Sequence, residues 1–373
     1  MIGNILKSLG LLFALGSGQA ALADRDAVRT YFFGNSLVHH LGEEPHRTAV
    51  PFWVGQLAQA AGKDFATEGH WGFLRNFATD LPPRPNWTFP GIEDAWPRHE
   101  TPFADIGFDS VVLSPANFIQ FQKPDIPYLD ENPDDYSPLT AILEVFDFVT
   151  EARPDARLML YEGWADMGPI TGGFPPEEPG YSRYIAVNAG EHPDWYSDLE
   201  AQIARARPDW TVIRIPTAQV LSRLLSEGGV LAGIDPLELF ADASPHGTPS
   251  LYLLAGMVTY AALYDAPPPA AFAVPRDIAA PIRENYAEIV EIIGEMRPDQ
   301  ARMQDRSEQS GDDDTTAHHE AQAVPPTLGE PKARDDAPAP RDDRRSAAAQ
   351  DSEATAPVVG EPGRIERVPE IRL

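Results

Sequence analysis

Short apolar runs and amphipathic stretches alternate along residues 27–296. The apolar runs, such as residues 28–33, are rich in β-branched and aromatic side chains and have the length of buried strands. Between them, apolar side chains recur at helical spacing, most clearly after Ser137 and Pro138, which suit the N-cap and the first position of a helix. The pattern therefore predicts an α/β protein.

The predicted elements follow one another in a βαβα order. Strands are expected at residues 28–33, 64–67, 109–113, 157–161 and 210–215, and helices at 50–61, from 138 onward, and at 194–206, 217–225, 249–264 and 278–296. Such alternation favours a doubly wound parallel sheet of about five strands with helices on both faces. A Pro- and Trp-rich stretch, 80–105, and a Gly- and Pro-rich stretch, 163–190, are longer than connections require, so we expect them to shape a substrate site.

Both ends of the chain depart from this pattern. Residues 1–23 have the features of a secretory signal peptide, with Lys7 before an apolar segment and a small-residue cleavage site. We therefore expect the folded domain, residues 24–296, to be secreted or periplasmic, with an uncleaved amino-terminal anchor as the alternative. Residues 297–373 contain no Phe, Trp or Tyr, and this composition predicts a disordered acidic, Pro- and Ala-rich tail.

Charge and cysteine content argue against several classes of protein. The chain carries 57 acidic and 29 basic residues, a formal net charge of −28. Such a surface repels nucleic acid and anionic membranes, so neutral or apolar substrates are favoured. A chain without cysteine has no disulfides, thiol nucleophiles, thiolate zinc sites or iron–sulfur clusters. The stability of the exported domain must then come from burial of its core.

Ser36 lies where the first predicted strand ends, in the sequence Gly34-Asn35-Ser36. Three small residues suit a sharp turn, and open parallel sheets bind ligands at the carboxyl ends of their strands. We therefore interpret Ser36 as a residue that faces substrate from a rigid element. Taken alone, the same residues also fit an ordinary strand-ending turn. The glycine that the Gly-x-Ser-x-Gly elbow of α/β-hydrolases requires is missing, which argues against that fold.

A second group of reactive residues lies near the end of the predicted domain, where Asp242 precedes His246 by four residues. A serine hydroxyl becomes a good nucleophile only with an imidazole within hydrogen-bond reach, and the imidazole needs a carboxylate that orients it. A loop that enters the helix predicted from Pro249 can supply both groups. A solvated helix-entry loop is the alternative for this segment alone, but its occurrence together with Ser36 favours the catalytic interpretation.

With these two blocks the chain resembles the SGNH (GDSL-like) hydrolase family. The resemblance rests on residues 34–37 (Gly-Asn-Ser-Leu) and on Asp242 and His246, and it would cover about residues 26–296. It implies a flavodoxin-like, three-layer α/β/α fold. It also implies that Ser36 is the nucleophile, His246 the general base and Asp242 the carboxylate that orients the base.

The resemblance further implies an oxyanion hole. Its donors would be the backbone N–H of Ser36, the N–H of Gly72 and the side-chain amide of Asn117, with Gly69 as the fallback for the glycine. A turn glycine and a polar loop residue are the alternatives for Gly72 and Asn117. The resemblance implies neither a metal ion nor an organic cofactor.

One group of residues could instead hold a metal ion. His39, His40 and His46 lie close in sequence to Glu43 and Glu44. A helix-spaced His-Glu-x-x-His motif is missing from the chain, so we expect no metal there.

Four tryptophans have two interpretations. Trp71, Trp87, Trp96 and Trp164 lie in or beside predicted loops. They could stack on a sugar ring or an acyl chain, or they could pack in the core. His192, before the helix expected at 194–206, is interpreted as part of a helix-start loop.

These expectations define an exported serine esterase. It would hydrolyse an acyl ester through an acyl-enzyme, with O-acetyl groups on carbohydrate as the first substrate class and short-chain acyl esters or lysophospholipid next. We expect a small-molecule or carbohydrate ester as partner, no nucleic acid, and no membrane span in the mature chain; the oligomeric state is left open. The alternatives are a non-catalytic carbohydrate-binding or assembly protein on the same fold, and an O-acyltransferase to a polysaccharide.

Overall fold

The computed structural model describes residues 25–41, 46–115, 122–129 and 132–296. The elements in these ranges are β1 (Ala27–Gly34), α1 (Val50–Ala60), β2 (Asp64–Trp71), α2 (Leu74–Thr79), β3 (Glu93–Asp94), the 3-10 turn η1 (Phe103–Asp105), β4 (Ser110–Leu113), α3 (Pro138–Ala152), β5 (Arg157–Tyr161), α4 (Gly168–Thr171), α5 (Gly180–Ala189), α6 (Glu191–Ala206), β6 (Val212–Ile215), α7 (Thr217–Leu225), α8 (Pro236–Leu239), α9 (Pro249–Tyr264), α10 (Ala280–Glu284) and α11 (Tyr286–Glu295). The predicted signal peptide and tail, and Asn117, lie outside the described residues. Within them, no helix is long and apolar enough to cross a membrane.

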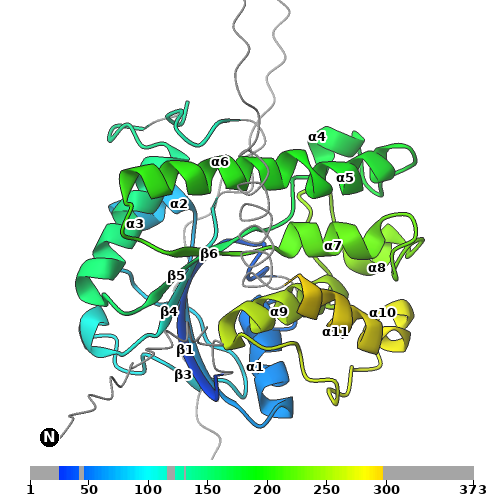
Figure 1. Cartoon of the computed structure of the whole chain (residues 1–373), viewed down its shortest axis with the longest axis horizontal. Coiled ribbons are helices and arrows are strands. Elements are labelled where there is room, and N and C mark those ends of the chain that lie inside the picture. The colour runs from blue at the N-terminus through cyan, green and yellow to red at the C-terminus, as the bar shows by residue number, and fades with distance from the viewer. Residues whose placement is uncertain (1–24, 42–45, 116–121, 130–131, 297–373) are drawn as a thin grey trace, which may run out of the picture. The chain divides into compact units, whose positions relative to one another are not determined.

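Six parallel strands form one sheet in the order β3-β2-β1-β4-β5-β6 (Figure 1). The chain leaves β1 toward β2 on one side and returns to β4 on the other, so the connections diverge beside the end of β1. In open α/β sheets this switch point is where ligands bind. The structure confirms a parallel α/β sheet, but with six strands instead of about five. The extra strand, β3, has two residues and lies in the predicted 80–105 loop, too short to give an apolar pattern.

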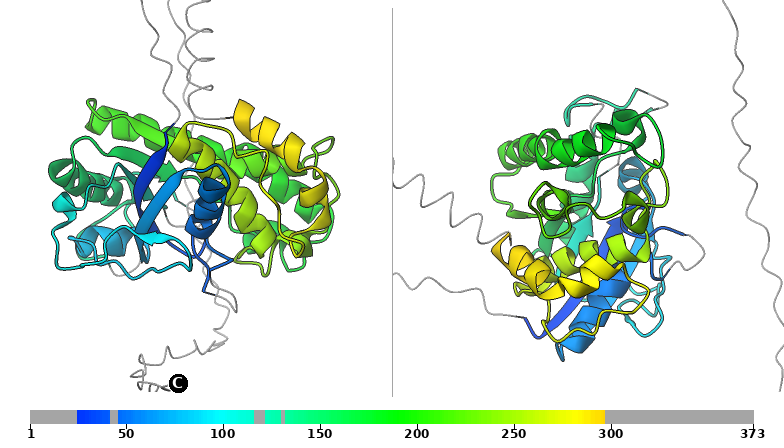
Figure 2. Two further views of the ribbon diagram at one scale, coloured as in Figure 1. Left: turned by 90° about the horizontal axis from the view of Figure 1, so that it is seen from below. Right: turned by 90° about the vertical axis from the view of Figure 1, so that its right-hand side faces the viewer.

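Helices cover both faces of the sheet, which gives the three layers that the resemblance implies (Figures 1 and 2). One core lies between the sheet and helices that include α1, α7 and α9, and the other lies against α2, α3 and α6. Phe32 packs into the first core, whereas Tyr31 and Phe33 pack into the second. The sequence of β1 is a mainly apolar run because the strand is buried on both faces.

Helix α9 is buried on nearly every side. A helix that is apolar all round belongs in an interior. Its Gly256 approaches Trp53 of α1 so closely that a Cβ would lie 2.5 Å from the Trp53 Cβ. At its carboxyl end, the Arg157 guanidinium donates to the carbonyls of Leu263 (2.5 Å) and Ala262 (3.2 Å). These contacts fix the helix that follows the predicted Asp-His loop.

Several helix boundaries differ from those predicted. Helices α4 and α5 lie in the stretch 163–190, which was expected to be a loop. Helix α6 begins at Glu191, so His192 is buried in its first turn and not in a loop. Pro193 is tolerated there because a first-turn N–H has no intrahelical partner. The helix predicted at 278–296 is divided into two helices, α10 and α11, which are separated at Asn285. By contrast, the cap predicted for α3 is confirmed, since Ser137 forms a capping box with Thr140.

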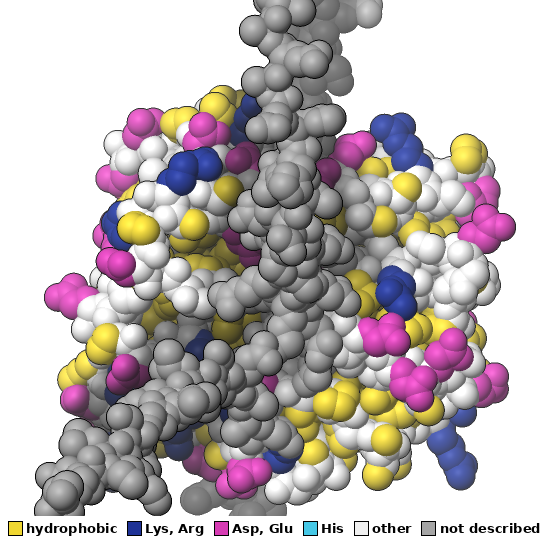
Figure 3. Space-filling model, viewed as in Figure 1, with side chains coloured by type: hydrophobic (Ala, Val, Ile, Leu, Met, Phe, Trp, Pro, Cys, Tyr) yellow, Lys and Arg dark blue, Asp and Glu magenta, His cyan; other side chains and the backbone are white. Residues whose placement is uncertain are grey.

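Acidic side chains are scattered over the face of the protein in Figure 3 instead of gathering in one patch. Lys and Arg side chains lie between them. The net negative charge is therefore diffuse on this face, and it does not by itself mark a binding site.

Candidate active site

The turn that carries Ser36 is organised by the side chain of Asn35. Its Oδ1 accepts the N–H of Leu37 (2.9 Å), and its Nδ2 donates to the carbonyl of Pro115 (3.1 Å), just after β4. Asn35 is completely buried, so both bonds are shielded from water. The amide thus ties the end of β1 to the end of β4 and holds Ser36 at the switch point of the sheet.

Gly34 is required by close packing beneath this turn. A Cβ at position 34 would lie 2.8 Å from Cη2 of Trp87 and 2.9 Å from Cβ of Val38. Side chains essentially never pack that closely, so the indole of Trp87 can cover the end of β1 only where the strand lacks a side chain.

The loop between α8 and α9 carries the other two predicted residues. Oδ2 of Asp242 lies 2.6 Å from Nδ1 of His246, and Oδ1 accepts the N–H groups of Ser244 (2.9 Å) and His246 (3.1 Å). An antiparallel bridge between Phe240 and Gly247 closes the loop. Since Nδ1 faces the carboxylate, Nε2 is the ring nitrogen left to act on another group.

The electrostatics of this pair suit a general base. Burial raises the pKa of Asp242, but hydrogen bonds from the His246 ring and from the N–H groups of His246 and Ser244 outweigh it, so the pKa lies below its ordinary value. An ionised Asp242 can stabilise the imidazolium that forms when His246 takes up a proton. The nearby Asp166 has a raised pKa, because of its burial and, less strongly, because of Asp242.

Ser36 and His246 line the same open pocket, although they are separated by most of the domain in sequence. The pocket has a volume of about 400 Å³, and its other lining residues are His40, Leu41, Trp71, Phe73 and Ser244. The ring of His40 stacks on that of His246, with centroids 4.0 Å apart and planes at 18°. His40 is itself anchored, because its N–H donates to the carbonyl of Thr48 (2.8 Å).

Three buried side chains support the two segments that carry Ser36 and His246. The Tyr252 hydroxyl donates to the carbonyl of Ser36, the Tyr161 hydroxyl to that of Leu37 (3.3 Å), and the Trp164 indole N–H to that of Pro245 (2.8 Å). All three donors are at most 1% exposed. The bonds join α9 and the end of β5 to the loops that carry Ser36 and His246.

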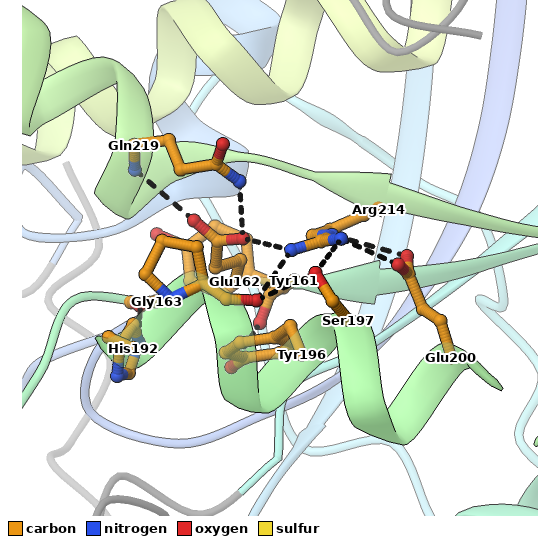
Figure 4. A network of polar contacts seen from close by, with 10 residues as sticks. Tyr161, Glu162, Gly163, His192, Tyr196, Ser197, Glu200, Arg214 and Gln219 are labelled. Carbon is orange, nitrogen blue, oxygen red and sulfur yellow. Dashed lines mark hydrogen bonds and ion pairs between the residues drawn. The ribbon is translucent and has the colours of Figure 1, made fainter. Parts of the chain in front are cut away.

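A buried polar network continues from the end of β5 (Figure 4). The Glu162 carboxylate, 0% exposed, accepts hydrogen bonds from Arg214 of β6 (3.2 Å) and from the side chain of Gln219 of α7 (3.0 Å). Arg214 also pairs with Glu200 of α6 (2.6 Å). Burial of Glu162 outweighs Arg214 and Gln219 and raises its pKa to about 7. The network connects strands β5 and β6 to the helices on either face.

The two glycines considered for the oxyanion hole are placed less favourably. The N–H of Gly72 donates to the carbonyl of Gly34 (2.9 Å), within the pairing of β1 and β2. The N–H of Gly69, the fallback, donates to Oε1 of Glu68 (2.9 Å). Both amides are therefore already engaged in this structure.

The three histidines considered for a metal site contact different neighbours. His39 packs against Trp87 (centroids 5.3 Å apart), His46 packs against Phe52 (5.3 Å), and His40 packs against His246. The two glutamates of that group, at positions 43 and 44, lie outside the described residues.

The tryptophans divide between the two roles considered for them. Trp87, Trp96 and Trp164 are at most 4% exposed and belong to the cores. Trp71 is partly exposed and lines the pocket beside Ser36.

Ser36, Asp242 and His246 are candidates that the sequence suggests, whereas the residues that hold them in place were not among the candidates. Asn35 lies inside the Gly-Asn-Ser turn, and its amide could have been recognised as a local hydrogen-bonding group. His40 was considered only as a metal ligand. For Tyr252 and Trp164 the sequence carries no comparable signal.

Fold and site together define a flavodoxin-like α/β protein with an Asp-His pair and a strand-end serine on one pocket. Among solved structures, the chain is similar to a protein provisionally described as an SGNH hydrolase from Slackia heliotrinireducens (18% identity, 63% of this chain and 97% of that one, TM-score 0.33). It is also similar to a family 3 carbohydrate esterase from Clostridium thermocellum (14%, 63% and 94%, 0.34) and to a family 2 carbohydrate esterase with a carbohydrate-binding domain from Corynascus thermopiles (Myceliophthora fergusii) (15%, 63% and 65%, 0.32). No protein-family model matches the chain, and no curated protein matches it.

Proposed function

We propose that this protein is a serine esterase whose nucleophile is Ser36. The observation that carries the proposal is the 2.6 Å contact between Asp242 and Nδ1 of His246, on a loop that shares its pocket with Ser36. A carboxylate behind an imidazole, with a serine on the same pocket, is the arrangement that acyl transfer to a hydroxyl requires.

The reaction follows from this arrangement. His246 Nε2 takes the proton of the Ser36 hydroxyl as its oxygen attacks the ester carbonyl, and the charge on Asp242 stabilises the resulting imidazolium. His246 then gives the proton to the departing alcohol, which leaves an acyl group on Ser36. Water, deprotonated by the same ring, then attacks the acyl carbonyl. The bond to Ser36 breaks, the ring returns the proton to the Ser36 oxygen, and the carboxylic acid is released.

The oxyanion formed at each step needs donors beside Ser36. We assign the N–H of Ser36, with the Gly72 N–H and the Asn117 amide as the further candidates. An oxyanion would compete with the Gly34 carbonyl for the Gly72 N–H, because that bond exists already. Each well-placed donor typically lowers the barrier by a few kcal/mol.

The pocket fits a short acyl group attached to a larger alcohol. Its opening is bordered by Leu41 and Phe73, which are 62% and 39% exposed, and by Trp71. Such a rim offers apolar contact to an acyl methyl and a flat surface to a sugar ring. We therefore take O-acetyl groups on exported carbohydrate as the substrate class, with short acyl esters or lysophospholipid next.

Hydrolysis of p-nitrophenyl acetate by full-length protein tests the proposal. We expect S36A and H246A each to lower kcat/KM by at least about 10³-fold, since residues of a triad act as a unit. Ser244 lines the same pocket, so S244A is the matched control and should retain activity. A fluorophosphonate probe should label the peptide that contains Ser36.

Three outcomes would count against the assignment. Full activity in S36A, or labelling of another serine, would refute Ser36 as the nucleophile. Glycan binding without any turnover would favour a non-catalytic carbohydrate-binding protein. Acetyl transfer to an added polysaccharide that exceeds hydrolysis would favour an O-acyltransferase.

A further inference from the structure

A second polar cluster lies on the edge of the sheet, away from Ser36. It is built on Glu68 of β2, whose side chain is 2% exposed. Oε1 of this carboxylate accepts the N–H groups of Gly69 (2.9 Å) and Trp87 (3.3 Å). These bonds fix the carboxylate and leave Oε2 directed toward two other side chains.

Those two side chains are Asp94 of β3 and His99. One ligand atom from each of the three residues lies within 4.8 Å of the other two, and Nε2 of His99 is 3.9 Å from Oε2 of Glu68. In the part of the chain that the structure describes, neither Glu68 nor Asp94 forms an ion pair with Lys or Arg. Glu68 and Asp94 thus bring two carboxyl groups together, one of them almost fully buried, and such an arrangement is costly unless a cation lies between them.

We propose that Glu68, Asp94 and His99 bind a divalent cation of the Zn²⁺ or Mn²⁺ type. Two carboxylate oxygens and one imidazole nitrogen form a mixed ligand set that these ions accept, whereas Ca²⁺ and Mg²⁺ take oxygen ligands. No motif in the sequence indicates this site, because its ligands come from three separate segments: β2, β3 and the turn that follows β3.

The geometry requires only a small movement. Ligand atoms around a tetrahedral zinc ion are about 3.3 Å apart, and those of the cluster lie within 4.8 Å of one another, so no pair must approach by more than about 1.5 Å. The His99 side chain is 54% exposed and can move inward, whereas Glu68 is held by its two backbone donors. Water would complete the coordination on the exposed side.

The ion would fasten the segment between β2 and β4 to the edge of the sheet. Trp87, which donates its N–H to Glu68, packs its indole over Gly34, two residues before Ser36. The proposed ion would thus have a structural role, and Trp87 would connect its site to the turn that carries Ser36. Its existence does not depend on the proposed esterase activity.

Isothermal titration of EDTA-treated, full-length protein with ZnCl₂ or MnCl₂ tests the proposal. We expect saturable binding of one ion at this site, a raised melting temperature, and weaker responses to CaCl₂ and MgCl₂. H99A and E68Q should each lower the affinity at least tenfold. H99A replaces an exposed side chain, so it keeps the test valid if E68Q fails to fold.

Two controls separate this site from other sources of binding. E93Q removes a neighbouring exposed carboxylate that pairs with Arg29, and it should bind as the wild type does. The tandem His318 and His319 could also bind zinc, so H318A/H319A should retain the assigned site. No saturable binding of either ion, an unchanged affinity in H99A, or a loss confined to H318A/H319A would each overturn the proposal.

Discussion

The hydroxyl of Tyr252 offers a direct test of how Ser36, the proposed nucleophile, is positioned. It donates to the carbonyl of Ser36, and its side chain is completely buried. Burial raises the pKa of Tyr252 well above its ordinary value, so the hydroxyl keeps its proton at any pH used in an assay. The variant Y252F removes this hydrogen bond and little else, because the ring is retained.

The expected effects follow from the value of one buried hydrogen bond. Its loss should lower the free energy of unfolding by about 1 kcal/mol. If that bond holds Ser36 in its reactive position, its loss should raise the activation free energy by up to about 1.4 kcal/mol. Such an increase lowers kcat/KM by up to about tenfold. We expect a fall of about three- to tenfold, mainly in kcat.

The same helix supplies a matched control. Tyr264, also 0% exposed, donates its hydroxyl to the carbonyl of Asp64 (2.7 Å), where β2 begins. Y264F therefore removes the same kind of bond at the opposite end of the strands. Urea unfolding should show similar destabilisation in both variants, whereas p-nitrophenyl acetate kinetics should fall only in Y252F. Equal activity in the two variants would refute the positioning role of Tyr252.

Two further substitutions test the surroundings of the pocket. H40A removes the ring stacked on His246 and should lower kcat about three- to tenfold with little change in KM. H40F, which keeps an aromatic ring at this position, should restore most of the loss. Identical kinetics in the wild type, H40A and H40F would contradict a positioning role for His40. Glu162 has a pKa of about 7 in the fold against an ordinary 4.5. The native state therefore keeps a proton that the unfolded state releases between these values, and the free energy of unfolding should fall by up to about 3 kcal/mol as pH rises from 4.5 to 7. E162Q should lose that decline in urea unfolding at the two pH values, and an unchanged decline would show that Glu162 does not cause it.

The sequence predicts best those features that depend on patterns within one element. The strand around Phe32 was predicted because both of its faces are buried, which leaves a continuous apolar run. Ser137 and Pro138 marked the start of α3 because capping is a local interaction. The position of Ser36 just after the first strand also predicted that it lies at the carboxyl ends of the parallel strands. In the structure it lines a pocket there together with His246.

Features that depend on tertiary pairing were missed. Glu93 and Asp94 form a strand only because the edge of β2 is available to them, and neither residue favours a strand by itself. His192 was interpreted as part of a helix-start loop, but it lies in the first turn of α6, where the following Pro193 is compatible with a helix. For Trp164 both a core and a loop role were left open, because the carbonyl that its indole N–H contacts, that of Pro245, lies far along the chain.

The hydrogen bonds beneath the pocket explain why the sequence suggests candidate residues for the site but not how they are held together. Tyr252, Tyr161 and Trp164 each donate to a backbone carbonyl, and every residue has one. The identity of the accepting residue therefore does not indicate the contact, whereas serine, histidine and aspartate side chains have a recognisable chemistry. A candidate serine, histidine or aspartate can therefore be recognised individually in the sequence. The hydrogen bonds that bring these residues together form only when α9 is packed against the sheet.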